Sequence, residues 1–188
     1  LAFNSVTAQA QLFNMDIEYI RSLIRTIPDF PETGIQFKDI TPLLLDTKAN
    51  ELTLSALQKP FDTLTINKVI GVESRGFLFG PILAAKFQAG FVPARKKGKL
   101  PYKTIQKEYG LEYGKDILEM HTDAINPGDK VIIHDDLLAT GGTAKAATEL
   151  VLELGGQVVG YSFIIELSFL SGKNQLLKEI PYHSIIKY

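Results

Sequence analysis

The chain of 188 residues contains no cysteine. Disulfide bonds and thiol catalysis are therefore excluded, and the composition fits a reducing compartment, so we expect a cytoplasmic protein. No apolar run approaches the roughly 20 residues that a helix needs to cross a bilayer, so we expect no association with membranes. The net charge is also small, because 20 Lys and Arg residues nearly balance 21 Asp and Glu residues to give −1. Such a balance does not favour general adhesion to nucleic acid, and any anion site must be local.

The first fourteen residues contain little that predicts structure. Residues 1–14 carry no charge and show no periodicity. We interpret them as an expression remnant or a disordered extension, with the natural chain beginning at Met15. Residues 15–188 are expected to form one domain, because 45% of the chain is hydrophobic and its length suffices for a sizeable core.

The spacing of apolar residues predicts alternating helices and strands. The first helix is expected from Asp16 to Ile27, and residues 28–42 hold enough prolines and glycines to predict an irregular apolar loop. Further helices are expected over residues 47–58, 76–90 and 143–154, and strands over residues 68–72, 91–95, 130–135 and 158–166. Two strand–helix–strand units result. They predict an α/β fold, a doubly wound and mostly parallel sheet flanked by helices, with ligands beyond the carboxyl ends of its strands.

Residues 96–120 do not fit this alternation. They contain four glycine or proline breaks and many charges, followed by a short run from Asp116 to Met120. We expect a projecting two-stranded flap over about residues 100–120.

The segment from Val131 to Thr143, with the sequence VIIHDDLLATGGT, is the most informative part of the chain. Its apolar, β-branched start is typical of a strand buried on both faces. Asp135 and Asp136 follow where this strand is expected to leave the sheet, and carboxylates there can bind sugar hydroxyls. Small and hydroxylated residues come next, just before a predicted helix, so backbone amides and the helix N-terminus can surround a phosphate. We therefore predict a sugar-phosphate site that includes Ala139, Thr140, Gly141, Gly142 and Thr143.

Two nucleotide-binding motifs of similar chemistry do not match this segment. The Walker A loop needs a lysine after its last glycine, but Gly142 is followed by Thr143. The G-x-G-x-x-G fingerprint of dinucleotide-binding folds is missing as well. An ordinary strand, turn and capped helix without a ligand stays open as the simpler alternative.

The residues from Glu73 to Phe77, ESRGF, form a second short turn between a predicted strand and a predicted helix. Arg75 is expected at the same edge of the sheet as the two aspartates, and a guanidinium can bind phosphate oxygens through two hydrogen bonds. We therefore predict a second anion site at this turn. The alternative is an exposed ion pair between Arg75 and Glu73 without a role in binding.

Six positive charges gather within the thirteen residues from Arg95 to Lys107. Cations beside the strand that ends near Arg95 could neutralise a multiply charged phosphate group as its bond breaks. Such a cluster could instead lie on an exposed, solvated flap, or it could contact RNA, and both alternatives stay open.

The segment from Val131 to Thr143 resembles the phosphoribosyl pyrophosphate signature of the type I phosphoribosyltransferase family. Four other segments resemble the adenine-specific members of that family, in their order and nearly in their spacing: FPETGIQFKDITPLL from Phe30, ESRGFLFGP from Glu73, RKKGKLP from Arg95 and LEYGK from Leu111. The resemblance implies the type I phosphoribosyltransferase fold, with an N-terminal hood over about residues 28–45. It also implies Mg²⁺-dependent transfer of 5-phosphoribosyl from phosphoribosyl pyrophosphate to N9 of adenine, which gives AMP and pyrophosphate in purine salvage.

The resemblance assigns catalytic roles to four residues. Asp135 and Asp136 would bind the ribose hydroxyls and favour an oxocarbenium-like transition state. Arg75 would stabilise the departing pyrophosphate. Glu112 would be the catalytic glutamate, brought to the base when the flap closes and excludes water.

The resemblance also implies where substrates bind. The bond between Glu73 and Ser74 would be a non-proline cis peptide that turns backbone amides toward pyrophosphate. Adenine would meet backbone groups of the hood, which suit a 6-amino purine better than a 6-oxo purine. Further substrate-binding residues would be Gln36, Phe37, Lys38, Arg95, Lys99, Tyr113 and Leu167.

No dedicated protein metal site is expected, because Mg²⁺ would be held mainly by substrate oxygens and water. His134 has no second ligand at metal-binding spacing, and we interpret it as structural. The family resemblance further implies a homodimer whose other partners are the two substrates and the two products.

Three other functions stay open at this point. A 6-oxopurine or orotate transferase would share the phosphate site but not the hood. A non-catalytic regulator could keep the same fold to sense phosphoribosyl pyrophosphate. RNA binding through residues 95–107 is the third.

Overall fold

The structure, a computed structural model, describes residues 14–110 and 115–188, with Lys115 described through its backbone alone. The expectations for residues 1–13, and those for Leu111, Glu112 and Tyr113, lie outside the described residues. The chain divides into two compact units, Leu1–Ala56 and Leu57–Tyr188, and each is described by itself.

The first unit contains an antiparallel hairpin that the spacing of apolar residues did not predict. Residues 14–22 are helical, and Arg25–Pro28 (β1) then pairs with Gln36–Asp39 (β2). The predicted helix to Ile27 is therefore wrong in its last turn, and the predicted irregular loop contains a strand. The physical reason is that β1 forms by pairing with β2, which lies further along the chain. The spacing of apolar residues within one segment does not show whether such a partner exists. Two short segments complete the unit: α2 (Thr41–Leu44) and most of α3 (Thr47–Gln58).

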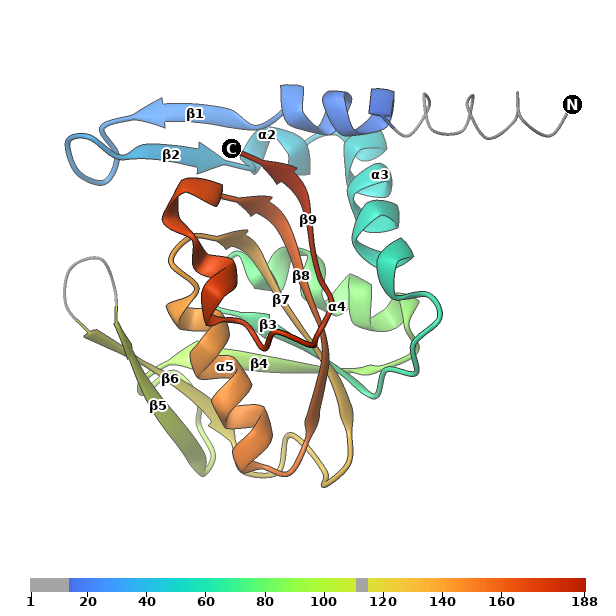
Figure 1. The fold of residues 1–188 in the computed structure, drawn as a ribbon, viewed down its shortest axis with the longest axis vertical. Helices are drawn as coiled ribbons and strands as arrows, with labels where there is room; N and C mark the ends of the chain where they lie inside the picture. The colour runs from blue at the N-terminus through green and yellow to red at the C-terminus, as the bar shows by residue number, and fades with distance from the viewer. Residues whose placement is uncertain (1–13, 111–114) are drawn as a thin grey trace, which may run out of the picture. The chain divides into compact units, whose positions relative to one another are not determined.

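The second unit is built on one seven-stranded sheet, drawn in Figure 1, with the strand order β5-β6-β4-β3-β7-β8-β9. The five strands from β4 to β9 in this order are parallel to their neighbours, whereas β6 is antiparallel to both β4 and β5. The strands are β3 (Lys68–Val72), β4 (Gly90–Lys96), β5 (Thr104–Gly110), β6 (Lys115–His121), β7 (Lys130–Leu138), β8 (Gln157–Glu166) and β9 (Tyr182–Lys187). The helices are α4 (Gly76–Lys86) and α5 (Gly142–Glu153), with 3-10 turns η1 (Lys59–Phe61), η2 (Ser168–Leu170) and η3 (Gly172–Gln175).

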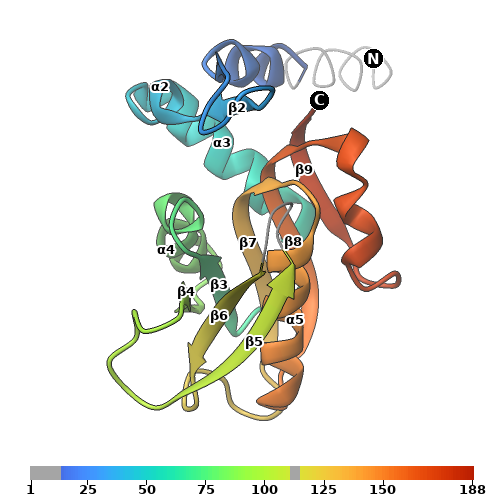
Figure 2. The same ribbon diagram turned by 90° about the vertical axis from the view of Figure 1, so that its left-hand side faces the viewer.

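The predicted fold class is confirmed, because a mostly parallel sheet carries helices on both faces. Figure 2 shows α4 and α5 on opposite sides of the sheet. Small and branched residues of α5, among them Ala147 and Leu150, pack against the buried side chains of Ile133 and Tyr161. No helix within the described parts of the chain is long and apolar enough to cross a membrane.

The predicted flap is confirmed as two antiparallel strands, β5 and β6. The register joins Tyr109 to Asp116 and Thr104 to His121. Since β6 also pairs with β4 through Arg95 and Glu119, the flap strands continue the main sheet.

The strand β7 is longer than predicted, which changes the setting of the two acids. It ends at Leu138, so Asp135 and Asp136 lie within the strand and not beyond it. The ladder continues because Leu137 and Leu138 pair with the long neighbour β8, through Ile165 and Glu166. Acidic residues are rare in strands, which is why the sequence suggested an earlier end. The predicted helix from residue 76 is shorter than expected and ends at Lys86, and the strand β9 was not predicted.

The sheet brings the two predicted anion sites to one edge. β3 and β7 are parallel neighbours, with Gly71 opposite His134. The turn after β3 and the loop after β7 therefore lie side by side at the carboxyl ends of the strands, as predicted for a doubly wound fold.

Candidate active site

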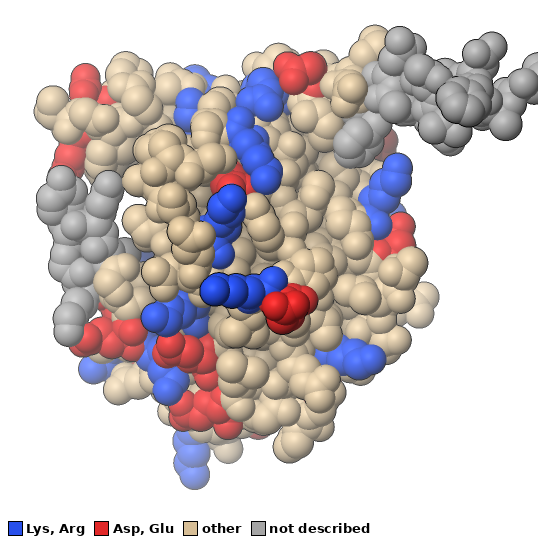
Figure 3. All heavy atoms as spheres, viewed as in Figure 1, with Lys and Arg blue, Asp and Glu red and all other residues tan. Residues whose placement is uncertain are grey.

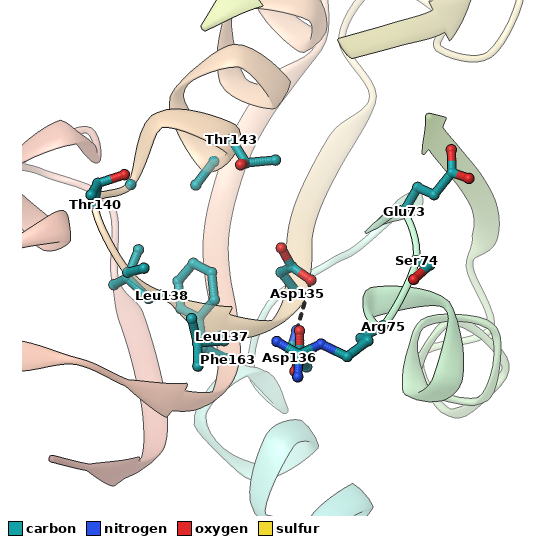
Figure 4. A pocket seen from close by; sticks show the side chains of 13 residues that line it. Glu73, Ser74, Arg75, Asp135, Asp136, Leu137, Leu138, Thr140, Thr143 and Phe163 are labelled. Atoms are coloured by element: carbon teal, nitrogen blue, oxygen red, sulfur yellow. Dashed lines mark hydrogen bonds and ion pairs between the residues drawn. The ribbon is translucent and has the colours of Figure 1, made fainter. Parts of the chain in front are cut away.

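A cavity of about 230 Å³ lies at this edge of the sheet, entirely within the second unit. Figure 4 shows the Glu73–Arg75 turn on one side of it and Thr140 on the other. Its lining unites most of the predicted phosphate and ribose site with the predicted anion turn. The lining residues are Glu73, Ser74, Arg75, Asp135, Asp136, Leu137, Leu138, Ala139, Thr140, Gly141, Thr143, Ala144 and Phe163.

The loop between β7 and α5 has a backbone that only glycine fits. Gly141 has φ +83°, and a Cβ on it would overlap the carbonyl oxygen of Gly172. A Cβ on Gly142 would lie 2.7 Å from the carbonyl oxygen of Gly110. α5 begins at Gly142, and the first amides of a helix have no acceptor within the helix. With the hydroxyls of Thr140 and Thr143 beside them, these amides can bind a phosphate.

The two aspartates have different surroundings. Asp136 is only 3% exposed, and its carboxylate Oδ2 lies 3.0 Å from Nε of Arg75. Asp135 is half-buried, and its Oδ1 accepts the backbone N–H of Asp136 at 2.9 Å. Burial, and then the neighbouring carboxylate of Asp136, raise the pKa of Asp135 well above its ordinary value. The ionised form of Asp135 is therefore unfavourable here, and a positive charge that approaches Asp135 from the cavity would stabilise it.

The turn after β3 is held by Arg95. Both Glu73 carboxylate oxygens accept hydrogen bonds from this guanidinium, at 3.0 and 3.2 Å, and Oε2 also accepts the backbone N–H of Lys96 at 3.0 Å. These hydrogen bonds, led by those from Arg95, lower the pKa of Glu73. The bond between Glu73 and Ser74 is cis, as the resemblance implied. Arg75 pairs with Asp136 on β7 and Glu73 pairs with Arg95 on β4, and these partners favour the predicted anion turn over a purely local ion pair between Arg75 and Glu73.

The basic cluster is partly neutralised by acids. Lys96 Nζ lies 3.0 Å from Asp116 Oδ2, and Lys107 Nζ lies 2.7 Å from Glu153 Oε2. Figure 3 shows basic and acidic side chains side by side over β5 and β6. With Arg95 bound to Glu73, three of the six cations have acidic partners within the described part of the chain, so the cluster is less suited to RNA than its sequence suggested.

Among the described residues of the second unit, four that the sequence predicted for the site do not line this cavity: Arg95, Lys99, Gly142 and Leu167. Arg95 faces Glu73 and also donates through Nη1 to the carbonyl oxygen of Lys99, at 3.0 Å, while the Lys99 side chain is exposed. Leu167 follows β8, where its backbone N–H donates to the carbonyl oxygen of Leu138 at 2.9 Å.

Sequence reasoning missed several lining residues. Phe163 pairs with Asp135 across β7 and β8, and only the register of two distant strands reveals it. The sequence also gives no sign that Leu137, Leu138 and Ala144 line the cavity. Apolar residues beside a polar motif are more commonly part of the hydrophobic core.

The predicted adenine-binding residues lie in β2 of the first unit. The ring of Phe37 packs edge-on against Phe30, with centroids 5.1 Å apart, and Lys38 Nζ donates to Thr26 Oγ1 at 2.9 Å. Gln36 is exposed at the start of the strand.

His134 is fully buried beside the aspartates, on β7. Its Nδ1 lies 3.1 Å from the carbonyl oxygen of Ser162, and burial lowers its pKa to about 4. The ring does not line the cavity, in keeping with a structural role. Within the described ranges, no group of three or more His, Cys, Asp or Glu side chains is arranged to hold a metal ion.

Comparison with known proteins identifies close relatives. The family model described as "phosphoribosyl transferase domain" matches residues 45–183. An adenine phosphoribosyltransferase of Flavobacterium johnsoniae is 53% identical over 90% of this chain and 99% of its own length. The crystal structure of adenine phosphoribosyltransferase from Rhodothermus marinus is 53% identical, has a TM-score of 0.90, and aligns over 93% of this chain and 99% of its own. The enzyme from Saccharomyces cerevisiae, complexed with D-2,5-dideoxy-2,5-imino-altritol 1,6-bisphosphate and adenine, is 39% identical with a TM-score of 0.86, over 92% of this chain and 99% of its own.

Proposed function

The chain belongs to the phosphoribosyltransferase family and, within it, to the adenine phosphoribosyltransferases, and we propose that it transfers 5-phosphoribosyl from phosphoribosyl pyrophosphate to adenine in purine salvage. One observation supports this most strongly: a single cavity combines a phosphate-binding helix start, two carboxylates and an arginine turn. In the reaction, the bond from ribose C1 to the pyrophosphate oxygen breaks, a bond from C1 to adenine N9 forms, and N9 loses its proton.

The loop from Ala139 to Thr143 would bind the 5-phosphate. Gly141 adopts a left-handed conformation where the loop turns into α5, the backbone amides at the start of this helix lack acceptors within the helix, and Thr140 and Thr143, which line the cavity, add hydroxyl donors. A fixed phosphate places the sugar over the carboxyl end of β7, next to Asp135.

The two aspartates would bind the ribose and stabilise its positive charge in the transition state. Asp135 faces the cavity and has a raised pKa, so an approaching cationic sugar carbon relieves its unfavourable charge. Asp136 would act mainly through Arg75, which it holds at 3.0 Å, beside the turn where pyrophosphate departs.

The turn at Glu73–Arg75 would bind the pyrophosphate. Arg75 would contact it directly, while Arg95 would fix the turn through Glu73, and Lys99 would add charge from its exposed position. A Mg²⁺ ion that enters with the substrate would be held mainly by substrate oxygens and water, and the residues fit such an ion because the carboxylate of Asp135 lines the cavity beside the proposed pyrophosphate turn. When bound, this ion would supply charge neutralisation for the leaving group.

Adenine recognition is proposed for the backbone of β2 around Gln36, Phe37 and Lys38, with Leu167 and Tyr113 as further contacts. A backbone carbonyl accepts from the 6-amino group and an N–H donates to a ring nitrogen, whereas a 6-oxo group would face an acceptor. Competition between adenine, hypoxanthine and orotate in one turnover assay tests this assignment. We expect adenine to be consumed almost alone, and preference for either other base would contradict it.

Glu112 would take the proton that N9 loses. We expect Glu112→Ala to lower turnover by at least about 100-fold, the range for a general base, with AMP affinity changed far less. Glu51→Ala, on the exposed face of α3, is the matched control and should keep full turnover. Equal losses of turnover and AMP affinity would mean that Glu112 only positions the ligand.

We further propose a cytoplasmic homodimer, as expected for the family. Light scattering on the purified protein in solution tests the dimer, and a measured mass equal to that of one chain would contradict it.

A further inference from the structure

The residues from Lys96 to Lys99 form a tight turn at the end of β4, where the strand meets the flap. The Lys99 N–H donates to the carbonyl oxygen of Lys96 at 3.2 Å and closes the turn, in which Gly98 has φ +76°. The Lys97 N–H donates to the carbonyl oxygen of Ile117 at 3.1 Å, on the flap strand β6. Two N–H groups of the turn therefore have backbone acceptors, and the acceptors of the other two decide how the turn is held.

The other two N–H groups donate to carboxylates that come from opposite sides of the turn. The Lys96 N–H donates to Glu73 Oε2 at 3.0 Å, and the Gly98 N–H donates to Glu119 Oε2 at 2.9 Å. Glu73 belongs to the proposed pyrophosphate turn, whereas Glu119 belongs to β6. The turn is thus held between the cavity and the flap.

Glu119 is an unusual residue for its place in the flap. It is only 6% exposed, and a glutamate is rarely so buried unless its carboxylate has a partner. The Gly98 N–H is such a partner, and Arg95 stands directly opposite Glu119 in the register of β4 and β6. A buried apolar residue would pack here at lower cost, so we attribute the glutamate to the acceptor that it supplies.

The guanidinium of Arg95 connects this turn to the cavity. Its Nη1 donates to the carbonyl oxygen of Lys99 at 3.0 Å, while Nε and Nη2 donate to the Glu73 carboxylate at 3.2 and 3.0 Å. If the turn moved, Arg95 would lose its contact to Lys99 and would no longer hold Glu73 in one position. An unbroken series of contacts therefore leads from Glu119 to the peptide bond between Glu73 and Ser74.

From these contacts we propose that Glu119 is a positioning residue of the pyrophosphate site. It holds the N–H of Gly98 and so fixes the turn that carries the exposed Lys99. Through Arg95, the same turn steadies the residues Glu73–Arg75. The inference rests on the proposed binding of pyrophosphate at these residues.

The proposed role affects one part of the cavity only. The series of contacts from Glu119 ends at the turn after β3, and the loop from Ala139 to Thr143 has no part in it. Loss of the Glu119 acceptor should therefore weaken the binding of pyrophosphate and spare the binding of ribose 5-phosphate. A merely structural role would weaken both.

Titration calorimetry with pyrophosphate and Mg²⁺, and separately with ribose 5-phosphate, tests this difference without requiring turnover. Glu119→Met keeps most of the side-chain volume and removes the acceptor. We expect it to raise the Kd for pyrophosphate by about 3- to 10-fold, the equivalent of one hydrogen bond, with the Kd for ribose 5-phosphate unchanged. Glu119→Gln should restore parental affinity, because its amide oxygen can accept the Gly98 N–H. Glu179→Met, at an exposed position before β9, is the matched control and should bind both ligands as the parent does.

Steady-state kinetics give a second readout. In Glu119→Met we expect KM for phosphoribosyl pyrophosphate to rise by a similar factor, while kcat and KM for adenine change far less. Equal changes in the KM values of both substrates would contradict a role at the pyrophosphate site.

The inference is overturned if Glu119→Met binds pyrophosphate as the parent does, if both ligands lose affinity alike, or if Glu119→Gln loses as much as Glu119→Met. A parent protein that binds no pyrophosphate would overturn it as well. A protein that shows the expected binding pattern but forms no AMP would contradict the proposed function and leave the positioning role standing. If Glu119→Met does not fold, Glu119→Asp decides the matter, because its carboxylate is one methylene too short to reach Gly98 and the same selective loss is expected.

Discussion

Nε of Arg75 lies 3.0 Å from Oδ2 of Asp136, and this ion pair joins the turn after β3 to the strand β7. Asp136 is almost fully buried, whereas about a third of the Arg75 side chain is exposed. The pair therefore connects the proposed pyrophosphate side of the cavity to its ribose side. A buried carboxylate that loses its cationic partner is costly, so the contribution of this pair can be measured through stability.

Arg75→Ala should destabilise the fold by about 1–3 kcal/mol, a figure reduced from that of a fully buried pair by the exposure of Arg75. Asp136→Asn should cost less, because it removes the buried charge. The double variant should recover part of the loss caused by Arg75→Ala. Urea unfolding of the four proteins measures this coupling, and strictly additive effects would show that the ion pair contributes nothing.

Gly141→Ala should damage both the fold and the phosphate loop. The left-handed backbone alone costs a residue with a side chain about 1–2 kcal/mol, and the new Cβ would also overlap the carbonyl of Gly172. Gly98→Ala is the matched control, because Gly98 has φ +76° with no atom within 4 Å of its Cβ position. Melting curves should show a lower melting temperature for Gly141→Ala than for Gly98→Ala. Titration with ribose 5-phosphate should show loss of binding in Gly141→Ala alone.

His134 should make the protein sensitive to acid. Burial lowers its pKa from 6.5 to about 4. The unfolded chain therefore binds a proton that the folded chain refuses between pH 6.5 and 4, so stability falls as the pH falls through this window. The loss should be of the order of 3 kcal/mol by pH 4. Urea unfolding of the parent and of His134→Gln at pH 7 and 4.5 measures it, and equal pH dependence in the two proteins would refute it.

Arg95→Lys should weaken substrate binding without direct contact. A lysine cannot reproduce the two-point contact with Glu73, so the turn after β3 loses its support. We expect KM for phosphoribosyl pyrophosphate to rise by about 3- to 10-fold, with a smaller change in kcat. Lys103→Arg, an exchange at an exposed position of the same cluster, should leave KM unchanged. An unaltered KM in Arg95→Lys would remove Arg95 from the site.

The parts of the site that depend on neighbouring residues could be predicted from the sequence. The loop from Ala139 to Thr143 consists of small residues before a helix, and its chemistry is readable without the fold. The turn around Arg75 was predicted for the same reason, and the parallel order of β3 and β7 brought the two together.

The parts that depend on distant pairing could not be predicted. From the sequence, either Glu73 or Asp136 could have been the ion-pair partner of Arg75. In the folded sheet Arg75 pairs with Asp136, and Glu73 pairs with Arg95. The apolar residues that lead into Arg25–Pro28 are spaced as in a helix, yet this segment forms a strand that pairs with β2. Pairing between distant segments outweighs the weak local preference for helix. The two acids likewise stay within β7 because β8 extends the ladder beyond them.

The formation of AMP tests the central claim most directly. The purified protein is incubated with adenine, phosphoribosyl pyrophosphate and Mg²⁺, and AMP and pyrophosphate are quantified together. The proposed function predicts that the two products appear in equal amounts and that omitting either substrate abolishes both. Pyrophosphate without AMP, or neither product, would contradict it.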